Sequence, residues 1–156
     1  MDELEKLAEE HRRDPENADL NFQLGVAEFQ SGKNEEALVT LQKALRLRPN
    51  FSKAHFYLAK VFDVFKRYDE MVDSFREAAY LDPGWPEAHY NLGLAFLVLG
   101  DYEEAIEPFQ KTIELNADFA EAHNGLSVAY GLTGKTGKAQ EHYAEAVRLN
   151  PEFDKT

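Results

Sequence analysis

The sequence predicts an all-α protein, an α-solenoid of antiparallel helix pairs, and three observations support this fold class. First, leucine recurs with a period of 34 residues, at Leu24, Leu58, Leu92 and Leu126. Second, each period contains two amphipathic runs joined by a short turn, the pattern of a helical hairpin. Third, proline recurs after the second run at the same spacing or twice that spacing, at Pro49, Pro83 and Pro151. A fixed period of this length indicates one supersecondary unit stacked on itself.

A short N-terminal helix is expected over residues 3–13. Its apolar positions follow helical spacing, at Leu4, Leu7, Ala8 and His11. The helix should end at Asp14, because the residue before a proline is driven out of the helical region.

Four repeats follow, and together with the N-terminal helix they are expected to form a single domain over residues 1–156. The repeats span 18–51, 52–85, 86–119 and 120–153. Each begins with a helix of about four turns whose apolar stripe follows helical spacing. A second helix follows and ends near a leucine, usually with a proline soon after it, which stops the helix.

The turn inside each repeat contains glycine in three of the four cases. Gly32, Gly100 and Gly134 can adopt the positive φ that ends many helices. The second repeat has Phe65-Lys66-Arg67 at this place, so its turn is less well specified. Acidic pairs such as Glu103-Glu104 are expected to open the second helices, where they suit the helix dipole.

Small residues mark the places where helices cross closely. Gly93 has counterparts in the other first helices at Gly25, Ala59 and Ser127. A large side chain at Gly93 should overpack the crossing and cost about 1–3 kcal/mol. Removal of the Phe109 side chain should leave a cavity that costs about 3–5 kcal/mol.

Composition excludes several classes of function. Lys and Arg number 17 against 29 Asp and Glu, and the formal charge of −12 argues against nucleic acid or an anionic membrane as partner. The chain has no cysteine, so disulfides and thiolate metal sites are excluded. No apolar run reaches the length of a membrane span, and the acidic start lacks a signal-peptide core. These features predict a cytoplasmic protein without membrane insertion.

No motif predicts catalysis, a cofactor or a metal. His55, His89 and His123 recur once per repeat, but equivalent atoms of stacked hairpins lie on the order of 10 Å apart, too far to share one ion. They are expected to be structural, and His11 and His142 to be isolated. The run from Gly134 to Lys138 lacks the upstream glycine and the strand of a phosphate loop, so it predicts a helix–helix turn.

The third repeat resembles the tetratricopeptide repeat. The residues that carry the resemblance are Leu92, Gly93, Phe96, Gly100, Tyr102, Ala105 and Phe109, and the match extends over residues 18–153. The resemblance implies a right-handed superhelix in which the first helices line a concave groove, and a protein-binding role without catalysis. Departures occur at Asn21, His55, His89 and His123, where a large aromatic residue is common, and at Glu28. Pro108 is expected to bend its helix.

The groove is unusually apolar for a face that stacking leaves open, although curvature could bury part of it. Exposed apolar patches usually mark interaction sites. The lysines Lys53 and Lys60 would pair with acidic groups of the ligand. We therefore predict an apolar or amphipathic peptide segment as ligand, with the partner-binding residues Phe22, Val26, Phe29, Lys53, Phe56, Tyr57, Lys60, Tyr90, Asn91, Leu94, Asn124 and Val128.

Two alternatives remain open. The fourth repeat is followed by only Asp154, Lys155 and Thr156, and its second helix keeps apolar surface at Tyr143 and Val147. That surface could mediate self-association as a scaffold, or the chain could be a regulatory fragment of a larger protein. A carboxylate clamp of the co-chaperone kind is not predicted, because Glu121 would repel a carboxylate.

Overall fold

The computed structural model describes residues 3–155, and the described part of the chain is all-helical. It contains nine α-helices and a terminal 3₁₀ helix, η1. The helices are α1 (Glu3–Arg13), α2 (Ala18–Gln30), α3 (Asn34–Leu47), α4 (Ser52–Val64), α5 (Tyr68–Leu81), α6 (Pro86–Leu99), α7 (Ile106–Leu115), α8 (Ala120–Leu132) and α9 (Thr136–Leu149), followed by η1 (Pro151–Lys155). The prediction of an all-α fold built of helix pairs is confirmed.

The chain divides into two compact units. The N-terminal unit spans Met1–Leu81 and holds α1 to α5, whereas the C-terminal unit spans Asp82–Thr156 and holds α6 to α9 and η1. Each unit has its own buried residues. The single domain expected over the whole chain stays a prediction.

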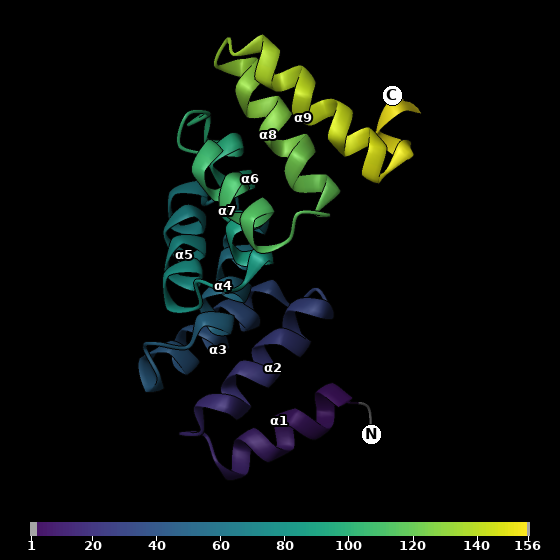
Figure 1. Cartoon of the computed structure of the whole chain (residues 1–156). Coiled ribbons are helices and arrows are strands. Elements are labelled where there is room, and N and C mark those ends of the chain that lie inside the picture. Colours follow the sequence, from purple (N-terminus) through teal and green to yellow (C-terminus); the bar gives the residue numbers. More distant parts are fainter. Residues whose placement is uncertain (1–2, 156) are drawn as a thin grey trace. The chain divides into compact units, whose positions relative to one another are not determined.

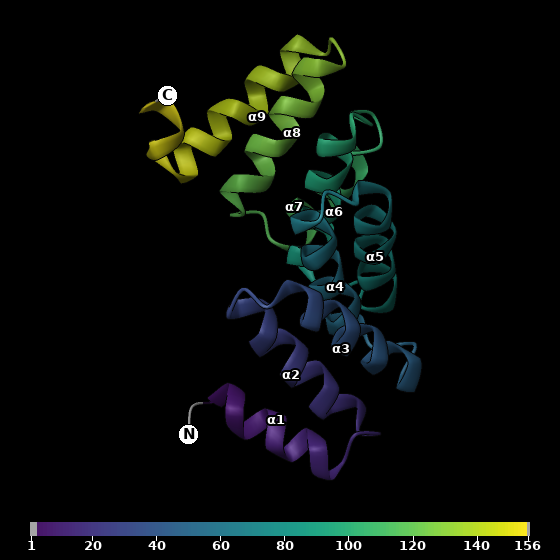
Figure 2. The ribbon, with the colours of Figure 1, turned by 180° about the vertical axis from the view of Figure 1, so that it is seen from behind.

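Two hairpins and the N-terminal helix build the N-terminal unit. In both views α1 lies alongside α2, which pairs with α3 (Figures 1 and 2). Leu41 of α3 is fully buried against α2. A Cβ atom at Gly25 would lie 2.7 Å from Leu41 Cγ, so only glycine allows this approach. The second hairpin, α4 with α5, buries Phe62 and Phe75.

The C-terminal unit consists of the hairpins α6–α7 and α8–α9, and α8 and α9 lie side by side in both views (Figures 1 and 2). Phe109 of α7 is fully buried at the centre of this unit. A Cβ atom would approach its ring to 2.7 Å from Gly93 and to 2.6 Å from Gly125. Glycines of two successive repeats therefore leave the space that this ring fills.

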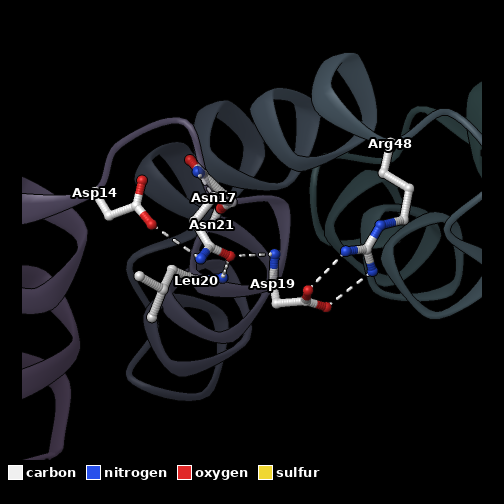
Figure 3. Close-up of polar contacts among 6 residues, drawn as sticks. All are labelled: Asp14, Asn17, Asp19, Leu20, Asn21 and Arg48. Carbon is white, nitrogen blue, oxygen red and sulfur yellow. Dashed lines mark hydrogen bonds and ion pairs between the residues drawn. The ribbon is translucent and has the colours of Figure 1, made fainter.

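Polar contacts fix the start of α2. The side-chain oxygen of Asn17 accepts hydrogen bonds from the backbone N–H groups of Asp19 and Leu20, at 3.1 and 3.2 Å. Such a cap satisfies amide groups that have no partner within the helix. Arg48 donates two hydrogen bonds to the Asp19 carboxylate, at 2.9 and 2.6 Å, which lowers the pKa of that carboxyl (Figure 3). This pair joins the two ends of the first repeat.

The turns agree with the glycine prediction and extend it to the second repeat. Gly32, Gly100 and Gly134 have φ of 76°, 92° and 76°. Lys66 stands at the equivalent place with φ 58°. The less specified turn therefore has the same left-handed conformation as the others, although a non-glycine residue occupies it.

One position in each first helix makes the same hydrogen bond. His55, His89 and His123 contact through Nε2 the backbone carbonyl oxygen six residues earlier, at 2.9, 3.0 and 3.2 Å. Asn21 donates through Nδ2 to the carbonyl of Pro15, at 2.9 Å. These side chains therefore tie each first helix to the segment before it, which is the structural role expected of the histidines.

The expected kink at Pro108 is wrong. Residues 102–105 form a turn and α7 begins only at Ile106. Pro108 consequently lies in the first turn of its helix, where backbone N–H groups have no intrahelical partner to lose. Glu103 and Glu104 lie in this turn and not in the helix, in contrast to the expectation.

Candidate functional site

The candidate site is the exposed side of the first helices, which we call the first-helix face. In the N-terminal unit α2 and α4 carry it, with Phe22, Val26, Phe29, Lys53, Phe56, Tyr57 and Lys60. In the C-terminal unit α6 and α8 carry it, with Tyr90, Asn91, Leu94, Asn124 and Val128. All the predicted partner-binding residues thus lie on first helices.

Four aromatic side chains form a connected cluster in the N-terminal unit. Phe22 packs on Phe51 and on Tyr57, with ring centroids 4.7 and 5.8 Å apart. Tyr57 in turn contacts Phe29 at 6.5 Å, edge to face. We call Phe22, Phe29, Phe51 and Tyr57 the aromatic cluster. Ring pairs at these distances attract each other beyond the effect of area burial. The cluster is therefore a preformed apolar surface, half-buried and not covered.

Lys60 lies over aromatic rings. Its ammonium is 5.5 Å from the ring centroid of Tyr57 and 5.8 Å from those of Phe29 and Phe56. Cations are attracted to aromatic faces at such distances. The side chain thus already has partners within the protein, which limits the pairing with a ligand acid that was predicted for it. Lys53, by contrast, is exposed.

Phe56 lies deeper than its predicted role as an anchor suggests. Only 9% of its surface is accessible, and its ring packs on Phe75 of α5 with centroids 5.3 Å apart. Tyr57, its neighbour in sequence, remains half-exposed on the first-helix face. Phe56 consequently stabilises the hairpin more than it can contact a ligand.

A pocket of about 390 Å³ opens between α1 and α2. We call it the N-terminal pocket, and its lining is Glu3, Leu4, Leu7, Phe22, Gln23, Val26, Ala27, Gln30 and Ser31. Phe22 also belongs to the aromatic cluster, so pocket and cluster are continuous. Sequence reasoning predicted Phe22 and Val26 as partner-binding residues of the groove but missed Leu4 and Leu7. The spacing of these leucines predicted an apolar stripe on α1. Only the packing of α1 on α2 shows that these two leucines line an open pocket.

The C-terminal unit presents a different first-helix face. Tyr90 packs on Phe109 and Phe119, with ring centroids 5.9 and 5.0 Å apart. Burial is the main cause of the raised pKa of Tyr90, and the nearby Glu121 carboxylate is the second cause. Asn91 donates a hydrogen bond to the carbonyl of Glu87, at 2.7 Å. Val128 is 42% exposed, and Leu94 and Asn124 are half-buried.

His11 and His142 are not isolated, in contrast to the prediction. His11 contacts Asn21 Oδ1 through Nε2 at 3.0 Å. His142 Nδ1 lies 3.1 Å from His123 Nδ1, and its ring stacks on Tyr130. Both contacts join side chains of two different helices, so the spacing of residues within one helix gave no signal for them.

Metal binding finds no geometric support in residues 3–155. No group of three or more His, Asp or Glu side chains there is placed to hold an ion. The two-histidine contact of His123 and His142 alone supplies too few ligands for a zinc site.

Family models of the tetratricopeptide repeat match residues 1–80, 86–119 and 120–153. The chain belongs to the tetratricopeptide repeat family. The matches over 86–119 and 120–153 have the bounds of the third and fourth repeats. Arrays of this family present extended surfaces to protein partners, so family and fold together support a protein–protein interaction scaffold.

Solved structures of MamA share the fold. One crystal structure of MamA has a TM-score of 0.89 at 23% identity, covering 98% of this chain and 90% of that chain. MamA from Desulfovibrio magneticus RS-1, residues 41 to the end, has a TM-score of 0.86 at 26% identity, covering 96% and 84%. The comparison with curated proteins finds no significant match. Among the described residues, no helix combines the length and apolarity needed to cross a bilayer.

Proposed function

We propose that this protein is a non-catalytic adaptor or assembly scaffold whose first-helix face binds an apolar or amphipathic peptide segment. The observation that carries the proposal is the N-terminal pocket and its continuity with the aromatic cluster through Phe22. Pockets that bind ligands are typically lined by apolar and aromatic side chains with a few polar groups. Gln23, Gln30 and Ser31 supply such groups at the pocket.

The proposed ligand inserts an apolar side chain between α1 and α2 and lies over Tyr57. Leu4, Leu7 and Val26 offer aliphatic walls, and the ring of Tyr57, which packs on the pocket residue Phe22, offers a rigid surface. Rigid aromatic residues are over-represented among the residues that dominate binding energy. Lys53, exposed on α4, is then the cation available to an acidic group of the ligand.

A peptide-display selection on the purified protein, followed by calorimetry with the selected peptide, tests the proposal. The variant Val26→Asp/Tyr57→Ala should weaken binding about tenfold or more, because it alters one pocket wall and one ring of the cluster. The matched control is Val39→Asp/Tyr80→Ala, the same substitutions at residues 63% and 78% exposed on the second helices α3 and α5. Equal affinities of the two variants, with circular dichroism showing both folded, would rule out the N-terminal face.

Self-association is a second candidate, favoured by the surface of α9. This helix buries only Ala146, whereas α5, its counterpart in the second repeat, buries six residues. Tyr143 remains 40% exposed and donates a hydrogen bond to the carbonyl of Phe153 in η1. Sedimentation equilibrium over a wide concentration range decides between the two: a monomer throughout removes self-association, and a dimer that Tyr143→Glu disrupts supports it.

A further inference from the structure

The first-helix face of the C-terminal unit has an apolar end that nothing in the unit covers. Val98 on α6 and Leu132 on α8 are each 55% exposed, and Val128, about one turn before Leu132 on α8, is 42% exposed. These residues stand in the last turns of two helices that contact each other. Soluble proteins rarely leave several large aliphatic side chains together in water, and such patches usually mark interaction sites.

The opposite end of the same face is acidic. Glu87 and Glu121 stand in the first turns of α6 and α8, and both are exposed. Neither helix contains a Lys or Arg residue. Glu121 on α8 is also, after burial, a cause of the raised pKa of Tyr90 on α6. The full negative charge of each carboxylate outweighs the partial positive charge of the helix N-terminus beside it.

The cations of the unit that the structure describes lie elsewhere and have partners. Lys111, Lys135 and Arg148 form ion pairs with Glu114, Glu103 and Glu145. Lys138 lies 5.3 Å from the ring centroid of Tyr130. These four residues belong to α7, α9 or the turn before α9, and none of them forms an ion pair with Glu87 or Glu121.

We propose that this face binds an amphipathic segment of a partner protein that carries aliphatic side chains at one end and Lys or Arg at the other. The inference rests on the proposed function and assigns the ligand's chemistry at the C-terminal unit. The aliphatic end packs on Val98, Val128 and Leu132, and the basic end pairs with Glu87 and Glu121. At 1.5 Å per residue, Glu87 and Val98 are about 16 Å apart along α6, which sets the spacing of the two ends of the ligand.

The first-helix face of the N-terminal unit differs in charge from that of the C-terminal unit. Lys53 and Lys60 lie on α4, so the first-helix face of that unit carries cations beside its aromatic cluster. A basic segment meets these cations at the N-terminal unit, whereas it meets no Lys or Arg on α6 and α8 of the C-terminal unit. Complementary charge mainly sets specificity and the rate of association, while the aliphatic contacts supply most of the affinity.

The test uses a synthetic amphipathic helix with leucines along one face and lysines in its end turns, together with the same peptide carrying glutamates in place of the lysines. Wild-type protein should bind the lysine peptide about tenfold more tightly, and added salt should reduce the difference. Glu87→Lys/Glu121→Lys should reverse the preference. The matched control is Glu104→Lys/Glu107→Lys, which changes net charge equally at exposed positions of the third repeat outside the face.

Three outcomes overturn the inference: no binding of the lysine peptide, equal binding of the two peptides, or equal effects of the two double variants. The variant Val128→Asp distinguishes failure of this inference from failure of the proposed function. A peptide whose binding is unchanged by Val128→Asp but is lost in Val26→Asp/Tyr57→Ala binds the N-terminal unit. In that case the proposed function stands and the present inference fails. Loss of lysine-peptide binding in Val128→Asp and in Glu87→Lys/Glu121→Lys, but not in the control, supports it.

Discussion

At the scale of the residue, Lys66 is the described non-glycine residue with positive φ. An L-residue in this left-handed conformation costs about 1–2 kcal/mol; glycine avoids this cost but loses part of the gain, because it gives up more conformational freedom on folding. Lys66→Gly should therefore raise the free energy of unfolding by about 0.5–1 kcal/mol. Chemical denaturation measures this. The reverse change in the first repeat, Gly32→Lys, should lower it by a similar amount, and no loss there would contradict the argument.

Glu28 is a second residue whose environment opposes its charge. Its Oε2 atom is buried without a hydrogen-bond partner among the described residues, and burial raises the pKa of the carboxyl although the Thr40 hydroxyl acts in the opposite direction. A raised folded pKa means stability that is present below the unfolded value of 4.5 and lost as pH rises through the folded value. The ionised carboxylate is thus a cost at neutral pH.

Glu28→Gln should stabilise the protein at pH 7 by about 0.5 kcal/mol, a small figure because solvent screens the partly exposed group. The advantage should shrink toward pH 4, where the native carboxyl is also protonated. Denaturation curves at the two pH values measure the difference. Glu35→Gln, at an exposed site in the first turn of α3, should bring no gain, and a gain there equal to that at Glu28 would contradict the role of burial.

At the scale of the element, the crossing of α6, α7 and α8 depends on two glycines that face one ring. Gly125→Ala places a methyl group 2.6 Å from the Phe109 ring and should cost about 1–3 kcal/mol. Gly131→Ala on the same helix is the control: its Cβ meets open space, so it should stabilise by about 0.5–1 kcal/mol. Phe109→Leu should recover part of the loss in Gly125→Ala, which thermal unfolding of the double variant would show.

The contact between α8 and α9 contains the pair of His123 and His142. His123 Nε2 donates to the carbonyl of Ala117, since that oxygen can only accept, so in the neutral ring Nδ1 accepts from Nδ1–H of His142. Burial and then His123 lower the pKa of His142. A depressed folded pKa means stability that is present above the unfolded value of 6.5 and lost as pH falls through the folded value.

Stability of the C-terminal unit should therefore fall as the pH is lowered from 7 to 5. Hydrogen exchange of α8 and α9 at both pH values measures this decline. His142→Gln should flatten it, whereas His89→Gln, which removes a histidine that hydrogen bonds to Pro83, should leave it in place. An unchanged pH profile in His142→Gln would show that His142 does not cause the decline.

At the scale of the whole molecule, the two units share a fold but differ in surface chemistry. Residues 82–156 contain five of the 17 Lys and Arg residues and 13 of the 29 Asp and Glu residues. The N-terminal unit combines aromatic rings with lysines on its first-helix face, and the C-terminal unit combines aliphatic side chains with carboxylates. The same repeat thus carries two first-helix faces that differ in composition.

The sequence by itself determined the repeat, the helix pairs and the helices that carry the exposed face. These follow from periodicity, turn glycines and prolines, which act over a few residues and leave a local pattern. The tertiary structure decided which side chains of that face stay accessible. Phe56 lies buried on Phe75 while Tyr57 stays open, Leu4 and Leu7 wall a pocket, and His142 meets His123. Burial and pairing depend on neighbours distant in sequence, and helical spacing fixes only the direction in which a side chain leaves its own helix.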